Sequence, residues 1–193
     1  ASVAADADAV VFSHPYNIGN GAAIKSGIRA ASGDILIFMD GDGQHDPANL
    51  SGLLKKLDEG FDMAIGARST SSHANIGRLW ANGVYNVAAS WLTGRSIPDL
   101  TSGFRVVRAE LFKRFLYLLP NGFSYPTTIT MAFLRAGYPI CFEAIPVADR
   151  VGKSHIRPLR DGVRFMVIIF KIATLYSPLK IFLPVSAVFL VSG

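Results

Sequence analysis

Residues 33–47 read GDILIFMDGDGQHDP, and this stretch decides the fold of the chain. The apolar run at 35–39 has the length of a buried strand and ends directly in acids, which predicts a parallel, central strand. Asp46 is a good helix cap and Pro47 suits the first helical position, so a helix is predicted over 47–59. A buried strand, an acidic turn and a capped helix therefore follow one another.

The flanking sequence continues this alternation. Residues 9–13 and 63–65 are strand-like apolar runs, and residues 21–31 read as a helix after a glycine-rich turn. A β-α-β-α-β order predicts right-handed crossovers and a parallel sheet covered by helices. In the second half the sequence predicts strands at 104–107 and 140–147, and helices at 75–92, 109–118, 126–136 and 159–176. The predicted fold class is α/β, with an open, mostly parallel sheet flanked by helices, in a chain of one-domain size.

The positive charge is concentrated near the C-terminus. The net charge is +5, and residues 150–193 hold seven Lys and Arg against one acid, so this part is +6 and residues 1–149 sum to −1. A local excess does not indicate a nucleic-acid binder, whereas a basic segment that merges into apolar sequence suits an anionic membrane surface. The mean hydropathy of +0.34 agrees with a membrane-facing part. Cys141 is the only cysteine, so no intrachain disulfide forms and an inert thiol is expected.

The last residues, 179–193, are apolar except for Lys180. They are too few to span a bilayer, which takes about 20 residues, and the sequence is still apolar where it stops. This pattern predicts the beginning of a transmembrane helix. The alternative is a buried or interfacial helix.

The acidic turn carries the candidate chemistry. Residues two apart in an extended segment point the same way, so Asp40, Asp42 and Gln44 are expected to converge at the carboxyl end of the strand. Ligands of open α/β sheets bind at that end. Two carboxylates there favour a cation between them, and hard oxygen ligands select Mg²⁺ or Mn²⁺. The alternative is a polar turn that only reverses the chain.

Four motifs together resemble a known family. They are NIGNGAAIKSGIRAASGDILIFMDGDGQHDP at 17–47, GAR at 66–68, DLTSGFR at 99–105 and DRVGKS at 149–154. In this order they resemble the inverting family 2 glycosyltransferases with the A-type fold, and in particular dolichyl-phosphate mannose synthase and its bacterial polyprenyl-phosphate relatives. The resemblance covers nearly the whole chain.

The resemblance implies roles for individual residues. Asp40 and Asp42 match the acids that carry the metal and the diphosphate of the nucleotide-sugar donor, and Gln44 matches a third metal ligand. Positions that match phosphate-binding residues of the family are Arg68, Arg150, Lys153 and Ser154, with Arg78 near the acceptor phosphate. The chemistry agrees, because a guanidinium forms bidentate bonds with phosphate, and cations stabilise a leaving diphosphate. For each arginine the alternative is a solvated charge or a structural ion pair.

Two further features have simpler interpretations. Asn17, Gly19 and Gly21 form a turn before a helix, whose amides are able to face a phosphate. A structural turn is the favoured interpretation. Asp99 opens the DLTSGFR motif, and the resemblance places it near the site, but its residue type also suits loop capping and no chemistry is assigned to it.

The acceptor is inferred from a missing acid. A sugar-hydroxyl acceptor needs a general base, and the window in which relatives of that kind carry one, residues 121–135, holds no Asp or Glu. An anionic phosphate needs no base. With the basic segment and the apolar tail, this predicts metal-dependent transfer of a sugar to a membrane polyprenyl phosphate, at the cytoplasmic face of the membrane. Asp149 or Asp99 acting as the base remains the alternative.

The family normally begins with a V-x-I-P-x-Y-N-E-like strand and a D-D-G-S-like turn, and neither is present. The resemblance therefore implies that residues 1–157 form a catalytic domain without its first strand-helix-strand, which puts the activity of the isolated chain in question. Residues 158–178 are expected to form an amphipathic helix at the membrane interface, and 179–193 the start of a membrane helix. Alternatives are a transferase for a sugar hydroxyl, a nucleotidyltransferase and a non-catalytic membrane-bound scaffold. The sequence does not indicate an oligomeric state.

Overall fold

A computed structural model describes residues 2–68, 76–122, 124–148 and 178–192, together with 163, 166–168, 170, 171 and 174. In the helix that starts at 76, the side chains of 76–82 and 84 are outside this description. The helices are α1 (Ser2–Asp6), α2 (Asn20–Ala30), α3 (Leu50–Asp58), α4 (Ile76–Thr93), α5 (Ala109–Arg114), α6 (Tyr125–Ala136) and α8 (Pro178–Ser192). The strands are β1 (Ile35–Phe38), β2 (Met63–Arg68), β3 (Arg105–Arg108) and β4 (Ile140–Ile145), and short 3₁₀ helices are η1 (Pro47–Asn49) and η2 (Leu116–Leu118).

The four strands form one sheet in the order β1-β3-β2-β4. β2 and β4 pair in parallel, with Met63 opposite Ile140 and Arg68 opposite Ile145. β3 lies between β1 and β2 and is antiparallel to both. Strands β1, β2 and β4 therefore share one direction, and their carboxyl ends meet at the same edge of the sheet.

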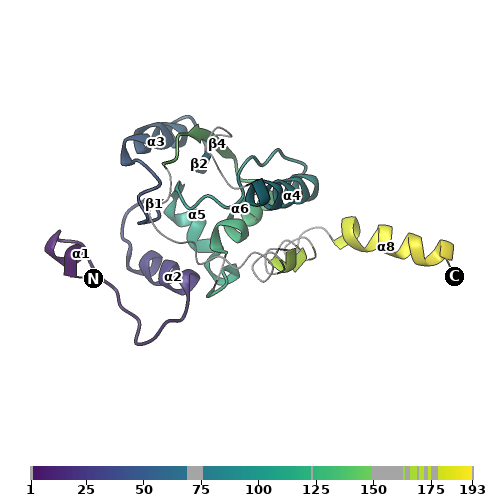
Figure 1. Ribbon diagram of the computed structural model, residues 1–193, viewed down its shortest axis with the longest axis horizontal. Helices are drawn as coiled ribbons and strands as arrows, with labels where there is room; N and C mark the ends of the chain where they lie inside the picture. The colour runs from purple at the N-terminus through teal and green to yellow at the C-terminus, as the bar shows by residue number, and fades with distance from the viewer. Residues whose placement is uncertain are drawn as a thin grey trace.

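Helices cover both faces of this sheet, because its strands alternate apolar side chains between the two faces. Met63, Ile65 and Val107 pack on one face against residues of α2, α5 and α6. Ala64 and Val106, the neighbours of these residues in sequence, pack on the other face against α3. A third cluster joins α4 to α6 beside the sheet. Figure 1 shows α3 on one side and α5 and α6 on the other.

Local signals in the sequence predicted most elements well. Asp46 caps the helical segment as expected, since its carboxylate accepts from the backbone N–H of Ala48 at 2.9 Å, and Pro47 occupies the first turn. Gly60 follows α3 with φ 97°. The predicted helix over 47–59 is present as η1 followed by α3. The strands predicted at 63–65, 104–107 and 140–147 are present as β2, β3 and β4. The helix predicted at 109–118 is present as α5 followed by η2, and the helix predicted at 126–136 is present as α6.

Two predictions about strands are wrong. Residues 9–13 form no strand, and Val10, Val11 and Phe12 are 86%, 41% and 67% exposed, because no described strand pairs with this run. The strand at 35–38 is present, but it lies at the end of the sheet order and its described neighbour, β3, is antiparallel. Its side chains alternate between exposed and buried, as expected of a strand with one covered face.

The chain after β4 is described only in part. The predicted interface helix at 158–178 lies mostly outside the described residues, although 163, 166–168, 170, 171 and 174 are helical. α8 follows, with Pro184 inside it, and Figure 1 shows it extending away from the sheet. None of the described helices has the length and apolar character needed to cross a membrane.

Candidate active site

The acidic turn leaves β1 at the edge where the parallel strands end. Gly43 has φ 73°, a left-handed conformation that glycine adopts without cost, and it turns the chain after Asp42. The backbone N–H of Gln44 donates to the Asp42 carboxylate at 3.2 Å. Gln44 is then fixed to the segment after β4, because its backbone carbonyl accepts from Ala148 at 3.0 Å and its side-chain Nε2 donates to the Ala148 carbonyl at 3.4 Å.

Asp40 packs against the backbone of Gly103 in the DLTSGFR loop. A Cβ atom at position 103 would lie 2.5 Å from Oδ2 and 2.9 Å from Cγ of Asp40, closer than such atoms approach in proteins. A side chain at position 103 would therefore push the Asp40 carboxylate away from its present position. The first and third motifs of the resemblance meet at this contact.

Arg68, the last residue of β2, forms a bidentate ion pair with Asp99. Its Nε donates to Oδ2 at 2.8 Å and its Nη2 donates to Oδ1 at 2.9 Å, while its backbone N–H also points to Oδ2 at 3.3 Å. The Nη2 group additionally contacts the hydroxyl of Thr101. The Asp99 side chain is 7% exposed and that of Arg68 is 39% exposed. Arg68 is thus held in place from one side while part of its side chain reaches solvent.

This pairing changes the titration of both groups. Burial alone would raise the pKa of Asp99, but hydrogen bonds and charge from Arg68 outweigh it, so the pKa is below its ordinary value. Burial alone would lower the pKa of Arg68, but hydrogen bonds and charge from Asp99 outweigh it and raise the pKa. Asp99 is therefore an ionised carboxylate whose acceptor atoms are already used, which makes it a poor general base.

Asp99 also organises the loop that contains it. Its Oδ1 accepts from the backbone N–H groups of Thr101 and Ser102, each at 3.1 Å. The hydroxyl of Ser102 donates to the carbonyl of Gly66 at 2.6 Å, which ties the loop to β2. The capping role expected for this residue type is confirmed, and the ion pair with Arg68 is an additional role.

His45 lies near the charged side chains of the acidic turn and of the Arg68–Asp99 pair. Its ring stacks on Phe104 with the centroids 5.1 Å apart. Burial is the main effect on its pKa and lowers it, while the negative charges of Asp40 and Asp42 oppose the shift. Smaller effects come from Arg68 and Asp99, so one imidazole lies within electrostatic range of four charged groups. The acidic turn, Arg68 and Asp99 therefore lie near one another around His45.

Arg105 holds the DLTSGFR loop next to the site in place through buried hydrogen bonds. It is fully buried and donates to the carbonyls of Ser102 and Pro126 and to the hydroxyl of Thr130. Burial lowers its pKa, opposed by the charges of Tyr125, Asp99 and Asp40. It therefore joins the DLTSGFR loop to the first turn of α6.

The glycine-rich turn before α2 is structural, as the sequence interpretation favoured. The N–H of Gly21 donates to the Gly122 carbonyl at 3.1 Å, and the N–H of Ala22 donates to the Asn121 carbonyl at 2.9 Å. A Cβ atom at Gly21 would lie 2.0 Å from the carbonyl oxygen of Pro120. These amides are used in packing the turn on the loop at 120–122.

The remaining predicted site residues are not placed. The backbone of Arg78 lies in the first turn of α4, but its side chain is outside the described part. Arg150, Lys153 and Ser154 lie outside the described residues altogether. The structure therefore brings together Asp40, Asp42, Gln44 and Arg68, and it adds Asp99, His45 and Gly103.

The donor set fits a hard divalent cation. The described residues contain no group of three or more His, Cys, Asp and Glu side chains suited to a metal. The acidic turn offers a cation two carboxylates, those of Asp40 and Asp42, and the side-chain amide oxygen of Gln44. Oxygen donors of this kind suit Mg²⁺ or Mn²⁺, and a short ligand set leaves positions for a diphosphate.

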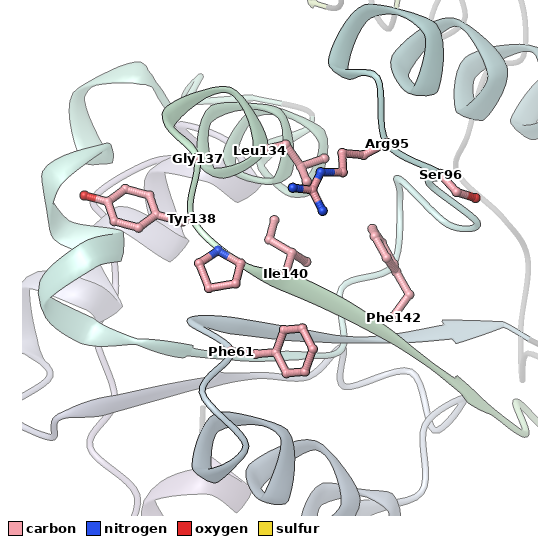
Figure 2. Close-up of a pocket in the computed structure, with 9 residues that line it drawn as sticks. Phe61, Arg95, Ser96, Leu134, Gly137, Tyr138, Ile140 and Phe142 are labelled. Carbon is pink, nitrogen blue, oxygen red and sulfur yellow. The ribbon is translucent and has the colours of Figure 1, made fainter.

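A separate pocket lies at the other end of the parallel strands, where β4 begins. It has a volume of about 350 Å³ and is lined mainly by apolar and aromatic side chains, including Leu134, Ile140 and Phe142. Figure 2 shows Arg95 extending into it from the loop after α4. The pocket shares no residue with the acidic turn or with the Arg68–Asp99 pair.

Comparison with known families identifies the family of the chain. Residues 2–116 match the family described as glycosyl transferase family 2. The chain belongs to this family. The match covers the acidic turn, Arg68, Asp99 and Gly103, so the described site lies within the family domain.

Two named relatives are similar to this glycosyltransferase chain, each at a little under 30% sequence identity. The dolichyl-phosphate hexose transferase of Haloferax volcanii is 28% identical over 148 residues, which is 75% of this chain and 63% of that protein. The polyprenol monophosphomannose synthase of Mycolicibacterium smegmatis is 29% identical over 146 residues, 72% of this chain and 54% of that protein. The chain therefore spans just over half to nearly two thirds of the length of these relatives.

Solved structures confirm the fold. Glucosyl-3-phosphoglycerate synthase from Mycobacterium tuberculosis superposes with a TM-score of 0.66 at 22% identity, over 88% of this chain and 63% of that one. A structure of the same enzyme with Mn²⁺, uridine-diphosphate-glucose and phosphoglyceric acid gives a TM-score of 0.64 at 21% identity, over 88% and 62%. The predicted A-type glycosyltransferase fold is confirmed.

Proposed function

We propose that the protein transfers a sugar from a nucleotide-diphosphate sugar to a membrane polyprenyl phosphate, with inversion at the sugar carbon and with Mg²⁺ or Mn²⁺ as cofactor. The site faces the membrane surface on the cytoplasmic side. The family supports the transferase class, and the names of the Haloferax and Mycolicibacterium relatives support the acceptor class. The Mn²⁺ and uridine-diphosphate-glucose bound in a structural neighbour support the donor and metal classes.

One observation carries the choice of acceptor. Asp99 is the acid beside the site that the sequence left open as a general base, and it is buried and paired with Arg68. An already ionised phosphate needs no group to remove a proton, so the engagement of Asp99 by Arg68 favours a phosphate acceptor over a hydroxyl acceptor. Asp149, the other candidate base, lies outside the described residues.

The proposed reaction balances without a proton transfer. An oxygen of the acceptor phosphate forms a bond to the anomeric carbon, and the bond from that carbon to the donor diphosphate breaks. A divalent cation held by Asp40, Asp42 and Gln44 would neutralise charge on the diphosphate. Arg68 contributes N–H groups and positive charge toward the phosphates, and Asp99 fixes the guanidinium plane. Arg150, Lys153, Ser154 and Arg78 are proposed as further phosphate-binding residues.

The test is a transfer assay with the protein at its natural length in membranes. Labelled nucleotide-sugars are offered with polyprenyl phosphate, in the presence of Mn²⁺ or Mg²⁺ and then of a chelator, for the wild type and Asp42→Asn. The proposal expects labelled lipid that disappears with the chelator and falls at least about 100-fold in the variant. Transfer to a free saccharide instead would contradict the acceptor, and no transfer to either would favour a non-catalytic role.

A further inference from the structure

The pocket at the amino ends of β2 and β4 has the size and the lining of a small-molecule site. Its volume of about 350 Å³ is at the lower end of the range, about 300–1,000 Å³, in which proteins hold small ligands. Apolar side chains of Phe61, Leu134, Ile140 and Phe142 form most of its walls. Figure 2 shows these side chains around that of Arg95.

The walls of this pocket are held by the packed interior. Ile140 and Phe142 lie on β4 and pack against the main core cluster. Leu134 lies on α6 and packs against the cluster that joins α4 to α6. The turn between α6 and β4 is tied to the segment before β2, because the carbonyl of Pro139 accepts from the N–H of Asp62 at 2.9 Å. The pocket is therefore formed by the fold itself and needs no ligand to create it.

The loop that carries Arg95 is anchored on both sides of this residue. The N–H of Gly94 donates to the carbonyl of Ser90 at 2.8 Å, and the N–H of Ile97 donates to the hydroxyl of Ser90 at 3.0 Å. Ile97 is buried in the cluster that joins α4 to α6. These anchors fix the point from which the Arg95 side chain starts, and Figure 2 shows its guanidinium directed toward Ile140.

The charge of the pocket indicates the chemistry of its ligand. Among the described residues that line it, Arg95 is the only charged one. Within the described part of the chain no carboxylate forms an ion pair with Arg95. A guanidinium presents its N–H donors in a planar fork that matches the oxygens of a carboxylate or a phosphate. A cation beside aromatic and aliphatic walls therefore suits a ligand with one anionic group and an apolar body.

This pocket is separate from the site at the acidic turn. β2 starts next to the pocket and ends at Arg68, and its six residues place the two ends roughly 17 Å apart at the rise of a strand. The segment after β4 reaches the site through the bonds between Ala148 and Gln44. A ligand in the pocket is thus a different molecule from one bound at the acidic turn.

We propose that this pocket, called here the Arg95 pocket, binds a small amphipathic anion. The ligand class is a compound with one carboxylate or phosphate group on an apolar body of one or two rings. The anionic group pairs with the guanidinium of Arg95. The apolar body displaces water from Phe61, Ile140 and Phe142, whose rings and aliphatic chain offer apolar faces.

Calorimetric titration with two probes of nearly the same shape tests the site. The protein at its natural length, in detergent micelles at about pH 7.5, is titrated with 2-naphthoate, which is ionised there, and with uncharged 2-naphthamide. Titration of empty micelles measures the partition of each probe into detergent and is subtracted. The proposal expects saturable binding of naphthoate, at least about tenfold tighter than that of naphthamide. Acetate, which has the charge without the apolar body, should bind at least about tenfold more weakly than naphthoate.

Three variants locate the probe on the protein. Arg95→Gln removes the positive charge at an exposed position and is expected to lower the affinity for naphthoate at least about tenfold, with the affinity for naphthamide unchanged. Phe61→Leu removes one aromatic wall and is expected to lower both affinities by a similar factor. Arg29→Gln, at an exposed arginine in the last turn of α2, is the matched control and changes neither affinity.

Several results would overturn the proposal. They are the absence of saturable naphthoate binding, equal affinities for naphthoate and naphthamide, and equal binding of naphthoate by the wild type and Arg95→Gln. If the wild type binds no naphthoate and forms an oligomer that Arg95→Gln dissociates, the pocket is a contact between copies and the proposal is wrong. If Phe61→Leu does not fold, Arg95→Gln decides alone, because its position is exposed. None of these measurements needs sugar transfer, so their result is independent of the proposed function.

Discussion

Arg68 and Asp99 are joined by two parallel N–H to oxygen bonds, of 2.8 and 2.9 Å, across a separation of 31 residues. One partner ends strand β2 and the other opens the DLTSGFR loop. The pair therefore determines both the loop position and the direction in which the guanidinium faces the site.

Asp99→Asn should weaken this arrangement without a change of shape. An amide keeps one acceptor but loses the charge and the second N–H···O bond, so kcat/KM is expected to fall about 100-fold, mainly through a higher donor KM. The free energy of unfolding should fall by about 1–3 kcal/mol, the range for an unmatched buried partner. Asp58→Asn, at an exposed position at the end of α3, is the control and should change neither quantity.

The loss of folding stability in Asp99→Asn should depend on pH with a defined sign. Because the folded pKa of Asp99 is lowered, its contribution to stability is present above the ordinary carboxyl pKa, about 4, and is lost as the pH falls through the folded value. The stability difference between wild type and Asp99→Asn should therefore be constant above about pH 5 and shrink below it. Chemical denaturation at several pH values measures this, and a difference that grows toward acid pH would contradict the ion pair.

Gly103→Ala should disturb the metal site but not the fold. The added Cβ meets the Asp40 carboxylate at 2.5 Å, and a side chain moves more easily than backbone. The apparent affinity for Mn²⁺ is expected to fall about 10- to 100-fold, as for changes that displace a metal ligand. Gly52→Ala is the control, since a Cβ there meets nothing within 4 Å. Unchanged Mn²⁺ titration in Gly103→Ala would show that Asp40 does not depend on this contact.

The glycine turn before α2 should matter for stability and not for phosphate binding. Gly21→Ala places a Cβ 2.0 Å from a backbone carbonyl oxygen and should lower the free energy of unfolding by about 1–3 kcal/mol, the usual cost of overpacking. Gly27→Ala, in the same helix and with open space around it, should be neutral or slightly stabilising. A large rise in donor KM in Gly21→Ala, at unchanged stability, would instead indicate a phosphate contact.

Cys141 should react slowly with alkylating reagents. Burial raises the pKa of its thiol from 9.0 to about 11, so the reactive thiolate is about 100-fold scarcer near neutral pH. The rate of modification by iodoacetamide in the folded protein should keep rising up to about pH 11, whereas the unfolded protein levels off about two pH units earlier. A folded protein that reacts like the unfolded one at pH 8 would exclude this shift.

The sequence predicted what depends on neighbouring residues. Asp46 and Pro47 start the helical segment because capping is a local interaction, and the missing Cβ of Gly60 ends it for the same reason. The acidic turn was found because a strand, two acids and a capped helix are adjacent. The place of β1 in the sheet was not predictable, because β3 comes from far along the chain and inserts antiparallel between β1 and β2.

The site was predictable only in part for the same reason. Asp40, Asp42 and Gln44 share one turn, but the contact of Asp40 with Gly103 joins segments that are distant in sequence. No spacing rule links Arg68 to Asp99. The available signal was Asp99, an acid in the motif that follows the predicted phosphate-binding Arg68. Loop capping explained this acid equally well.

Product analysis with two acceptors tests the central claim most directly. The protein at its natural length is given one labelled nucleotide-sugar, Mn²⁺, and either polyprenyl phosphate or the corresponding polyprenol without phosphate. The account predicts a labelled product only with the phosphate, with the sugar carbon inverted relative to the donor and with at least about 100-fold less product from Asp42→Asn. A product from the free polyprenol, or retention of the donor configuration, would contradict it.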